Sequence, residues 1–377
     1  MHLPPALAAG TVIHNELEVL DVLGVGAYGR VYLAKDMRSK KLYAIKSLYQ
    51  RGLDHRQCML QRNELTLHAQ LSHPHIVRLE RIISEKPDYV HIVLEYCPEG
   101  DLFSAITDRD LYYGNHDLIR SVFLQLLDAV RYCHAHNVYH RDLKPENILV
   151  FNGGKTVKLT DFGLATRDSI ANDYGCGSIF YFSPECQGDL SQRSGYATVP
   201  NDIWSLGIVL VNLATSRNPW REACIDDDMF RSYLADRDYL LKLLPISREL
   251  NRILKRILCI DPMRRISLDE LAEEIRNCKY FTRTEQVEQL EIPSRQRLQN
   301  IFPPSPPTTP RADISGFFSS TTCVAYGDNT SSSSPPPSPT SPLVPSLNKH
   351  SSGSNDHHHH SAAADATKMP PSPNPSR

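Results

Sequence analysis

The stretch His140-Arg141-Asp142-Leu143-Lys144-Pro145-Glu146-Asn147 is the most informative part of this sequence. Fourteen residues beyond Asn147 stands a second short motif, Asp161-Phe162-Gly163. Between the two, Asn152-Gly153-Gly154 predicts a hairpin turn that joins short strands at 148–151 and 157–160. Such a hairpin would fold Asn147 and Asp161 toward the same point.

Asn147 and Asp161 offer an amide oxygen and a carboxylate, which are hard oxygen ligands suited to magnesium. A magnesium ion bound there would also hold triphosphate oxygens. Asp142 is a carboxylate within reach of an incoming hydroxyl group, and Lys144 is a cation beside a transferred group. The two motifs therefore predict a catalytic site with a metal bound by Asn147 and Asp161.

A glycine-rich segment near the amino terminus predicts a flap that covers a nucleotide, because glycines let backbone amides approach phosphate oxygens. Alone, the pattern is equally typical of a plain hairpin turn. A dinucleotide-binding fingerprint would need a helix directly after the turn, whereas Val31-Tyr32-Leu33 continues as a strand, and no G-K-[ST] follows. The candidate flap residues are Leu23, Gly24, Val25, Gly26, Ala27, Tyr28 and Gly29.

Lys46 lies in Tyr43-Ala44-Ile45-Lys46, on the strand that follows the flap. A lone strand lysine is usually solvated. A lysine inside a cleft, however, needs a carboxylate partner to keep its charge against desolvation. Glu64, on the next predicted helix, is suitably placed to pair with Lys46, and the pair would aim the ammonium at two phosphates.

The periodicity of the chain predicts a small β-rich part followed by a larger helical part. We assign residues 15–97 to the first and 98–281 to the second, with an extension at 1–14 and a tail at 282–377. Alternating apolar residues predict strands, and i, i+3, i+4 spacing predicts helices. The predicted strands are 17–23, 30–36, 41–48 and 90–96, and the predicted helices include 57–70 and 117–134.

Composition excludes several other classes of protein. The 41 basic and 43 acidic side chains nearly cancel, so the chain as a whole has no attraction for nucleic acid or anionic membranes. The nine cysteines form no C-x-x-C pair, which argues against a zinc site or a disulfide framework and favours reduced thiols inside the cell. The longest apolar run, 204–214, is about half of the ~20 residues that a membrane span requires, and predicts a buried helix.

Taken together, the motifs resemble those of the eukaryotic protein kinases, in the same order along residues 17–281. Ser183-Pro184-Glu185 matches the family's A-P-E element with serine for alanine, and Asp202-Ile203-Trp204-Ser205-Leu206-Gly207 matches its buried helix start. The resemblance implies an α+β, bilobal protein-kinase fold. It also implies that Arg265 pairs with Glu185.

The same resemblance implies ATP and Mg²⁺ as cofactors and proteins as substrates. Asp142, Lys144, Asn147, Lys46 and Glu64 would be the catalytic residues. The adenine would lie between Val31 and Ala44 on one side and Leu149 on the other, with Leu94 as the gatekeeper and Asp101 near the ribose. The hinge would be Glu95-Tyr96-Cys97.

Lys144 resembles the serine/threonine members of the family rather than the tyrosine kinases. The segments 161–167 and 176–186 are most similar to fungal kinases that govern nutrient response and restrain meiosis. A pseudokinase scaffold is the alternative, but it predicts the loss of a residue such as Lys46 or Asp142, and both are present. A small-molecule kinase of similar fold is disfavoured by the intact segment 178–185. We expect cytoplasmic or nuclear residence, or both.

The segment 161–185 also suggests how activity is controlled. Arg141 next to Asp142 would ordinarily be neutralised by a phosphate on this segment. The usual phosphosite position, four residues before Ser178, holds Tyr174, and Asp173 beside it carries a permanent negative charge. We therefore expect activity without phosphorylation of this segment.

The tail is rich in serine and proline: fifteen of the 27 prolines lie between residues 301 and 377. Such a segment has too little apolar surface to offset its chain entropy, which predicts disorder. Regulatory partners or proline-directed kinases are candidate ligands of the tail. The hydroxyl residues that precede proline are Ser305, Thr309, Ser334, Ser338, Ser341 and Ser372.

Overall fold

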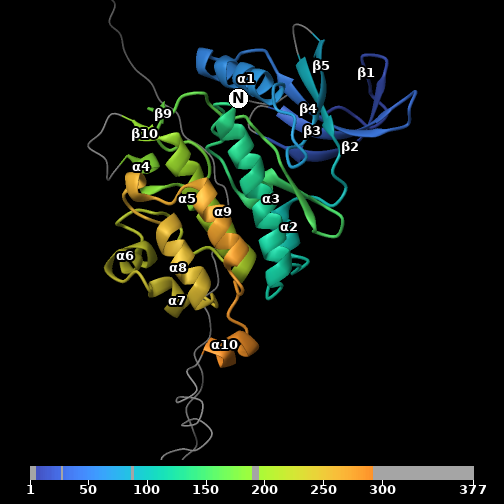
Figure 1. The fold of residues 1–377 in the computed structure, drawn as a ribbon. Coiled ribbons are helices and arrows are strands. Elements are labelled where there is room, and N and C mark those ends of the chain that lie inside the picture. The colour runs from blue at the N-terminus through green and yellow to red at the C-terminus, as the bar shows by residue number, and fades with distance from the viewer. Residues whose placement is uncertain (1–5, 27–28, 86–88, 189–194, 292–377) are drawn as a thin grey trace, which may run out of the picture. The chain divides into compact units, whose positions relative to one another are not determined.

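Six antiparallel strands form the small lobe of the computed structural model (Figure 1). The structure describes residues 6–26, 29–85, 89–188 and 195–291, all within the first of two units, residues 1–306. The strand order is β1-β2-β3-β4-β6-β5. The strands are β1 (Val12–Ile13), β2 (Leu17–Val25), β3 (Gly29–Asp36), β4 (Leu42–Tyr49), β5 (Leu79–Glu85) and β6 (Tyr89–Glu95).

The two faces of this sheet have different roles, because successive side chains of a strand point to opposite faces. Tyr32 pairs with Ile45 across β3 and β4, and both are buried in a core of the sheet's own residues. The next pair, Val31 and Lys46, lies on the other face. Helix α1 (His55–His68) packs on that side, and Asp54, the residue before it, caps its start with a capping box. The sheet thus presents Lys46 to the helix.

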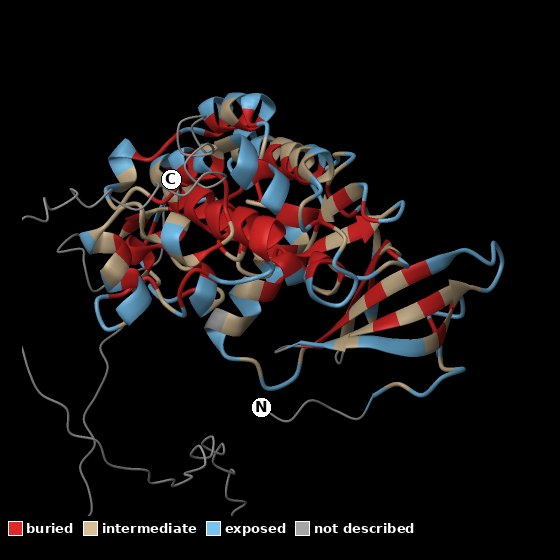
Figure 2. Ribbon diagram, turned by 90° about the horizontal axis from the view of Figure 1, so that it is seen from below, coloured by how far each residue is buried: buried red, intermediate tan, exposed pale blue. Residues whose placement is uncertain are grey.

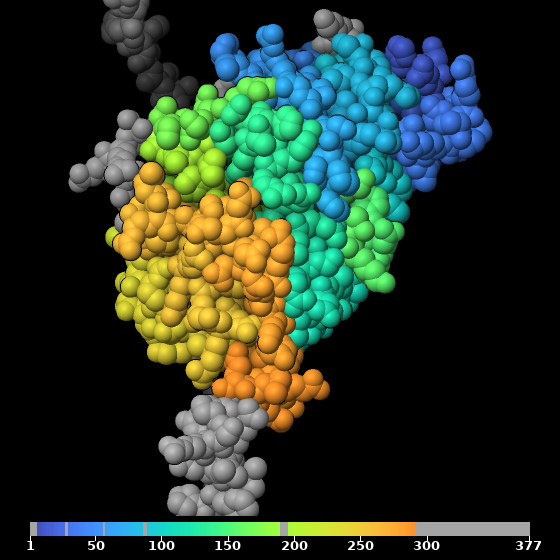
Figure 3. All heavy atoms as spheres, viewed as in Figure 1, coloured from blue at the N-terminus to red at the C-terminus, as the bar shows by residue number. Residues whose placement is uncertain are grey.

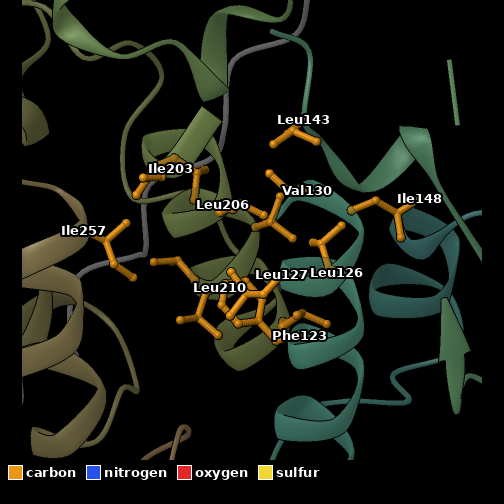
Figure 4. Packing of buried hydrophobic residues seen from close by; sticks show 14 of the residues in the cluster. Phe123, Leu126, Leu127, Val130, Leu143, Ile148, Ile203, Leu206, Leu210 and Ile257 are labelled. Atoms are coloured by element: carbon orange, nitrogen blue, oxygen red, sulfur yellow. The ribbon is translucent and has the colours of Figure 1, made fainter. Parts of the chain in front are cut away.

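The large lobe is built around α5 (Thr198–Thr215), whose residues from Asn201 onward are all buried. In Figure 2 the buried residues form a red band through the middle of the lobe. Figure 4 shows the packing of Phe123, Leu127 and Val130 from α3 (His116–Ala135) against Leu206 and Leu210. The prediction of a buried helix at 204–214 is confirmed, and within the described residues no helix is long and apolar enough to cross a membrane.

The remaining elements surround α3 and α5. In Figure 3, α3 and α9 form adjoining parts of one face of the lobe. The predicted hairpin at residue 152 is present, with Ile148 paired to Leu159. The elements are α2 (Leu102–Thr107), β7 (Ile148–Phe151), β8 (Thr156–Leu159), β9 (Ile170–Ala171), α4 (Pro184–Gln187), β10 (Tyr196–Ala197), α6 (Asp228–Ala235), α7 (Tyr239–Leu243), α8 (Arg248–Ile257), α9 (Leu268–Asn277), α10 (Glu285–Glu291) and the 3-10 turns η1 (Pro145–Asn147), η2 (Ile179–Tyr181) and η3 (Pro262–Arg264).

The bilobal α+β fold predicted from the sequence is confirmed, but ordered structure extends past the predicted lobe boundary at residue 281. Thr282 is fully buried and donates from Oγ1 to Ala214 O at 2.7 Å, and Val287 of α10 is 2% exposed. The composition changes near residue 283, yet these two side chains still pack on the lobe. Residues 292–377 lie outside the described part, and the assignments made for the tail remain predictions.

Candidate active site

Lys46 joins the small lobe to the Asp161-Phe162-Gly163 motif. Its Nζ lies 2.5 Å from Glu64 Oε1 and 2.8 Å from Asp161 Oδ1. The predicted pairing of Lys46 with Glu64 is therefore present, and Asp161 adds a second carboxylate to the same ammonium. The two carboxylates come from α1 and from the loop after β8, so the lysine links its own strand, β4, to two other segments of the chain.

The charges of this cluster stabilise one another. Burial alone would lower the pKa of Lys46, but the negative charges of Glu64 and Asp161 outweigh it and raise that pKa above its ordinary value. Burial likewise opposes ionisation of Asp161, yet the Lys46 ammonium holds the pKa of Asp161 at about 2. At neutral pH the site therefore presents an ammonium and an ionised carboxylate.

Asp142 is the centre of a second network, in the loop between α3 and β7. Lys144 Nζ donates to Asp142 Oδ2 at 2.8 Å and to Ser178 Oγ at 2.7 Å. Ser178 Oγ in turn donates to Asp142 Oδ1 at 3.0 Å. Asn147 Nδ2 donates to the backbone oxygen of Asp142 at 2.9 Å and to its Oδ2 at 3.0 Å. These contacts fix both carboxylate oxygens of Asp142.

The loop that carries Asp142 is anchored in the large lobe. The buried carboxylate of Asp202 accepts from the backbone N–H groups of His140 at 2.9 Å and Arg141 at 2.8 Å. Leu143 and Ile148, on either side of the loop residues, both insert into the core that α3 and α5 share (Figure 4). Arg141 has a φ of 64°, an uncommon conformation for a side-chain-bearing residue that the two hydrogen bonds to Asp202 maintain.

Backbone contacts bring the two networks together. Thr160 N, directly before Asp161, donates to Asn147 O at 2.9 Å. His140 Nε2 donates to Thr160 O at 3.0 Å. The hairpin of β7 and β8 thus places Asn147 and Asp161 side by side, as the sequence predicts, with Lys46 and Asp142 on either side of them.

The apolar residues expected around an adenine ring lie where the two lobes meet. Ala44 and Leu149 pack against the same buried cluster, which includes Leu94 and Cys97. Val31 lies directly across from Lys46 in the β3–β4 ladder. A flat aromatic ring placed among these residues would contact both lobes.

Two polar residues assigned to the nucleotide site are held by other contacts. Glu95 Oε1 lies 2.5 Å from Lys158 Nζ, and its Oε2 accepts from Arg78 N at 3.2 Å. Asp101 caps α2 by accepting from Ser104 N at 2.8 Å with Oδ1. Because these contacts hold the Glu95 side chain in place, any contact of Glu95 with the nucleotide would come from its backbone. One carboxylate oxygen of Asp101 already has a structural role as a helix cap.

The glycine-rich turn joins β2 to β3. Leu23 and Val25 are exposed, and Gly26 N donates to Gly29 O at 2.9 Å, which closes the turn. A Cβ at Gly29 would lie 2.0 Å from Ser47 O of β4, so only glycine fits there. Gly24 has open space around it, and Ala27 and Tyr28 lie outside the described residues.

These residues suit a nucleotide with a divalent cation. Both amide hydrogens of Asn147 point at Asp142, and among the described residues no hydrogen bond reaches Asn147 Oδ1 or Asp161 Oδ2. An amide oxygen and an ionised carboxylate are a fitting pair of ligands for magnesium. Lys46 supplies the positive charge for phosphate oxygens.

Comparison with known proteins agrees with this geometry. Residues 17–281 match the family model described as "Protein kinase domain". The chain belongs to the protein kinase family.

Three fungal relatives illustrate the match. The "Negative regulator of sexual conjugation and meiosis" of Schizosaccharomyces pombe is 48% identical over 299 residues, 74% of this chain and 63% of its own length. The "Serine/threonine-protein kinase ksp1" of the same organism is 37% identical over 64% of this chain and 53% of its own length. The "Serine/threonine-protein kinase VHS1" of Saccharomyces cerevisiae is 32% identical over 71% of each chain. The chain thus covers between about half and two thirds of the length of the two S. pombe proteins.

The segment 161–185 of the kinase is fixed at its far end by the expected ion pair. Arg265 Nη1 lies 2.5 Å from Glu185 Oε1 and Arg265 Nη2 lies 3.0 Å from Glu185 Oε2, and both side chains are buried. Ser183, the departure from the family's alanine, donates from Oγ to Asn201 Oδ1 at 2.8 Å and caps α4. The serine therefore adds a buried hydrogen bond to this anchor.

Sequence reasoning missed the aromatic contacts behind the site. The Phe162 ring lies 4.8 Å from the His68 ring and 5.1 Å from the His140 ring, measured between centroids. His68 Nε2 donates to Val77 O at 2.7 Å. His68 is 94 residues from Phe162 in the chain, and no spacing or motif connects the two. Only the packing of α1 on the large lobe brings them into contact.

Proposed function

We propose that this protein is a serine/threonine kinase that transfers the γ-phosphate of ATP to serine and threonine hydroxyls of protein substrates. The observation that carries the proposal is the network around Asp142, in which Lys144, Asn147 and Ser178 hold both carboxylate oxygens. Lys144 in this loop and the hydroxyl of Ser178 beside it are typical of the serine/threonine members of the family.

Each polar side chain of the site has a place in this reaction. Asp142 orients the substrate hydroxyl and accepts its proton, while Lys144 offsets the negative charge of the moving phosphoryl group. Lys46, held by Glu64, binds the α and β phosphates. The bond from the hydroxyl oxygen to the γ-phosphorus forms as the bond to the β–γ bridging oxygen breaks, and ADP leaves.

We propose Mg²⁺ as the metal, bound by Asn147 and Asp161. Bound magnesium would neutralise phosphate charge and orient the triphosphate. The pKa of Asp161 at about 2 supports this, because the carboxylate is ionised at any physiological pH and needs no deprotonation before it binds a cation.

The relatives support a role in cellular regulation. The relative named "Negative regulator of sexual conjugation and meiosis" supports a role in nutrient or cell-cycle signalling. We propose cytoplasmic or nuclear residence and protein substrates, with regulatory partners at the tail. A pseudokinase would bind nucleotide without transferring phosphate, and nothing in the site favours it, since Lys46, Asp142, Asn147 and Asp161 are all present and in contact with one another's networks.

Transfer of ³²P from ATP to a protein substrate tests the proposal. Asp142→Asn keeps the shape of the side chain but loses the base, so we expect kcat to fall by roughly 10²–10⁴-fold with little change in KM for ATP. Asp161→Asn should instead raise the Mg²⁺ concentration needed for half-maximal nucleotide binding. Wild-type protein that binds ATP but transfers no phosphate, or equal loss of kcat and ATP affinity in Asp142→Asn, would contradict the proposal.

A further inference from the structure

Arg141 carries a buried charge beside the catalytic carboxylate. Its side chain is 4% exposed. Nε donates to Leu164 O at 2.8 Å, and Nη1 lies 2.5 Å from Asp173 Oδ1. Among the residues that the structure describes, Asp173 is the only carboxylate within ion-pair distance of this guanidinium. A buried cation of this kind is stable only with a partner charge.

The position of Arg141 is tied to that of Asp142. The two residues are adjacent, and the backbone of Arg141 is held in its uncommon conformation by Asp202. Its side chain contacts the segment 161–185. Gly177 of that segment also lies close to the backbone of Arg141, since a Cβ at Gly177 would lie 2.6 Å from Arg141 O. Loss of the charge that pairs with Arg141 would therefore alter the position of the Asp142 loop directly.

Asp173 is itself held in place by the segment around it. Cys176 Sγ donates to Asp173 Oδ2 at 3.3 Å, so each carboxylate oxygen of Asp173 has a contact. Just before it, Ala171 of β9 pairs with Tyr196 of β10. Just after it, the Tyr174 hydroxyl accepts from Gly195 N at 2.7 Å. The structure thus ties the residues on both sides of Asp173 to Gly195 and Tyr196, just before α5.

In protein kinases, an activation loop is commonly ordered by phosphorylation, which creates a new pair between phosphate and arginine. Here the carboxylate of Asp173, which needs no modification, forms the ion pair with Arg141 that a phosphate would otherwise form. The residue at the usual phosphosite, Tyr174, has its hydroxyl engaged with Gly195. An acidic side chain that is always ionised at neutral pH needs no upstream kinase.

We propose that Asp173 is a positioning residue for phosphoryl transfer: through Arg141 it holds the Asp142 loop in its active arrangement without phosphorylation of the segment 161–185. The inference rests on the proposed function, because it concerns the activity of the same site. Its consequence is that the kinase is active as synthesised, so its regulation must act elsewhere than on this segment.

The first test uses the wild-type full-length chain. Treatment with a protein phosphatase, followed by mass spectrometry of the segment to establish that it carries no phosphate, should leave kcat within about twofold of the untreated enzyme. Activity lost on treatment, with phosphate mapped before treatment at Ser169 or Tyr174, would overturn the inference. Absence of activity both before and after treatment would count against the proposed function itself.

The second test separates charge from packing. Asp173→Asn keeps the size of the side chain and removes its charge, so kcat should fall at least tenfold with KM for ATP unchanged. Asp173→Glu should recover more activity than Asp173→Asn. The matched control is Asp168→Asn, because Asp168 is an acid of the same segment that contacts Thr166 and not Arg141. It should retain wild-type kcat.

A double-mutant cycle identifies Arg141 as the intermediary. In an Arg141→Met background the charge of Asp173 no longer has a partner to hold, so Asp173→Asn should cause little further loss of kcat. Additive losses, or a wild-type kcat in Asp173→Asn, would overturn the inference. Melting temperatures of all variants are measured alongside. Should Asp173→Asn fail to fold, the phosphatase experiment on the wild-type enzyme still decides the question.

Discussion

The two lobes hold their parts of the site by different means. In the large lobe, Asp142 lies in a loop anchored by Asp202, which is 0% exposed, and by apolar residues of the main core. In the small lobe, Lys46 is 21% exposed at its side chain and depends on two carboxylates from α1 and from the loop after β8. The arrangement of the catalytic loop therefore depends on the stability of the large lobe. The small lobe instead contributes the charge of Lys46, whose removal leaves the hydrophobic core of that lobe intact.

The strongest test of this difference is the buried pair of Glu185 and Arg265. Glu185→Gln leaves the fully buried guanidinium of Arg265 without a countercharge, and loss of one partner of such a pair costs about 3–5 kcal/mol. We expect the free energy of unfolding of the large lobe, measured by urea denaturation, to fall by that amount.

An exposed pair supplies the control. Arg276 and Glu273 lie 3.0 Å apart with side chains 53% and 65% exposed, so Arg276→Gln should change the free energy of unfolding by less than about 1 kcal/mol. Similar effects of the two substitutions would show that burial of the large-lobe anchor contributes little.

In the small lobe we expect a large loss of activity with a smaller loss of stability, because the side chains of Lys46 and Asp161 are 21% and 44% exposed and water screens their charges. Lys46→Met removes the ammonium that faces the phosphates, and loss of one such electrostatic contact costs roughly 10²-fold in kcat/KM for ATP. Glu64→Gln should cost less, roughly tenfold, because Asp161 still lies 2.8 Å from Lys46. Steady-state kinetics with varied ATP measure both effects, and thermal denaturation monitors the fold.

Lys41 is the matched control for Lys46. It lies just before the same strand, its side chain is 50% exposed, and it pairs with Glu80 at 3.1 Å on the surface. Lys41→Met should leave kcat/KM unchanged. A large loss of stability in Lys46→Met would mean that the lysine contributes to the structure of the small lobe, and the contrast between the lobes would be wrong.

The sequence was sufficient for the parts of the site that lie in continuous motifs. Asn147 and Asp161 could be placed together because the hairpin between them is short and its turn residues are specific. Lys46 and Glu64 could be paired because a strand lysine in a cleft requires a countercharge. In each case local geometry or charge balance left few alternatives.

Contacts between distant segments could not be predicted in the same way. Asp202 binds the backbone of the catalytic loop because α5 packs against that loop. The spacing of the residues in the sequence does not predict this contact. The ordered residues 282–291 were missed because composition reports the average character of a segment, whereas one buried threonine and one valine suffice to attach it.

His68 lies where the two lobes meet and is the least predictable of these contacts. It ends α1 in the small lobe and its ring packs on Phe162 of the large lobe. Burial lowers the pKa of His68 to about 4, and the nearby charge of Lys46 acts in the same direction. The histidine is therefore neutral at physiological pH and donates its Nε2 hydrogen to Val77 O.

The junction should accordingly weaken in acid. The pKa of His68 in the folded protein lies below the ordinary value of 6.5, so the unfolded chain takes up the proton first, and stability is lost as the pH falls from about 6.5 toward 4. Between pH 7 and pH 5 this loss amounts to about 2 kcal/mol. Glutamine does not titrate in this range, so between pH 7 and pH 5 the free energy of unfolding of His68→Gln should fall by about 2 kcal/mol less than that of the wild type. His136→Gln, at an exposed histidine, should follow the wild type, and identical pH dependence in all three proteins would show that protonation of His68 does not govern the contact between the lobes.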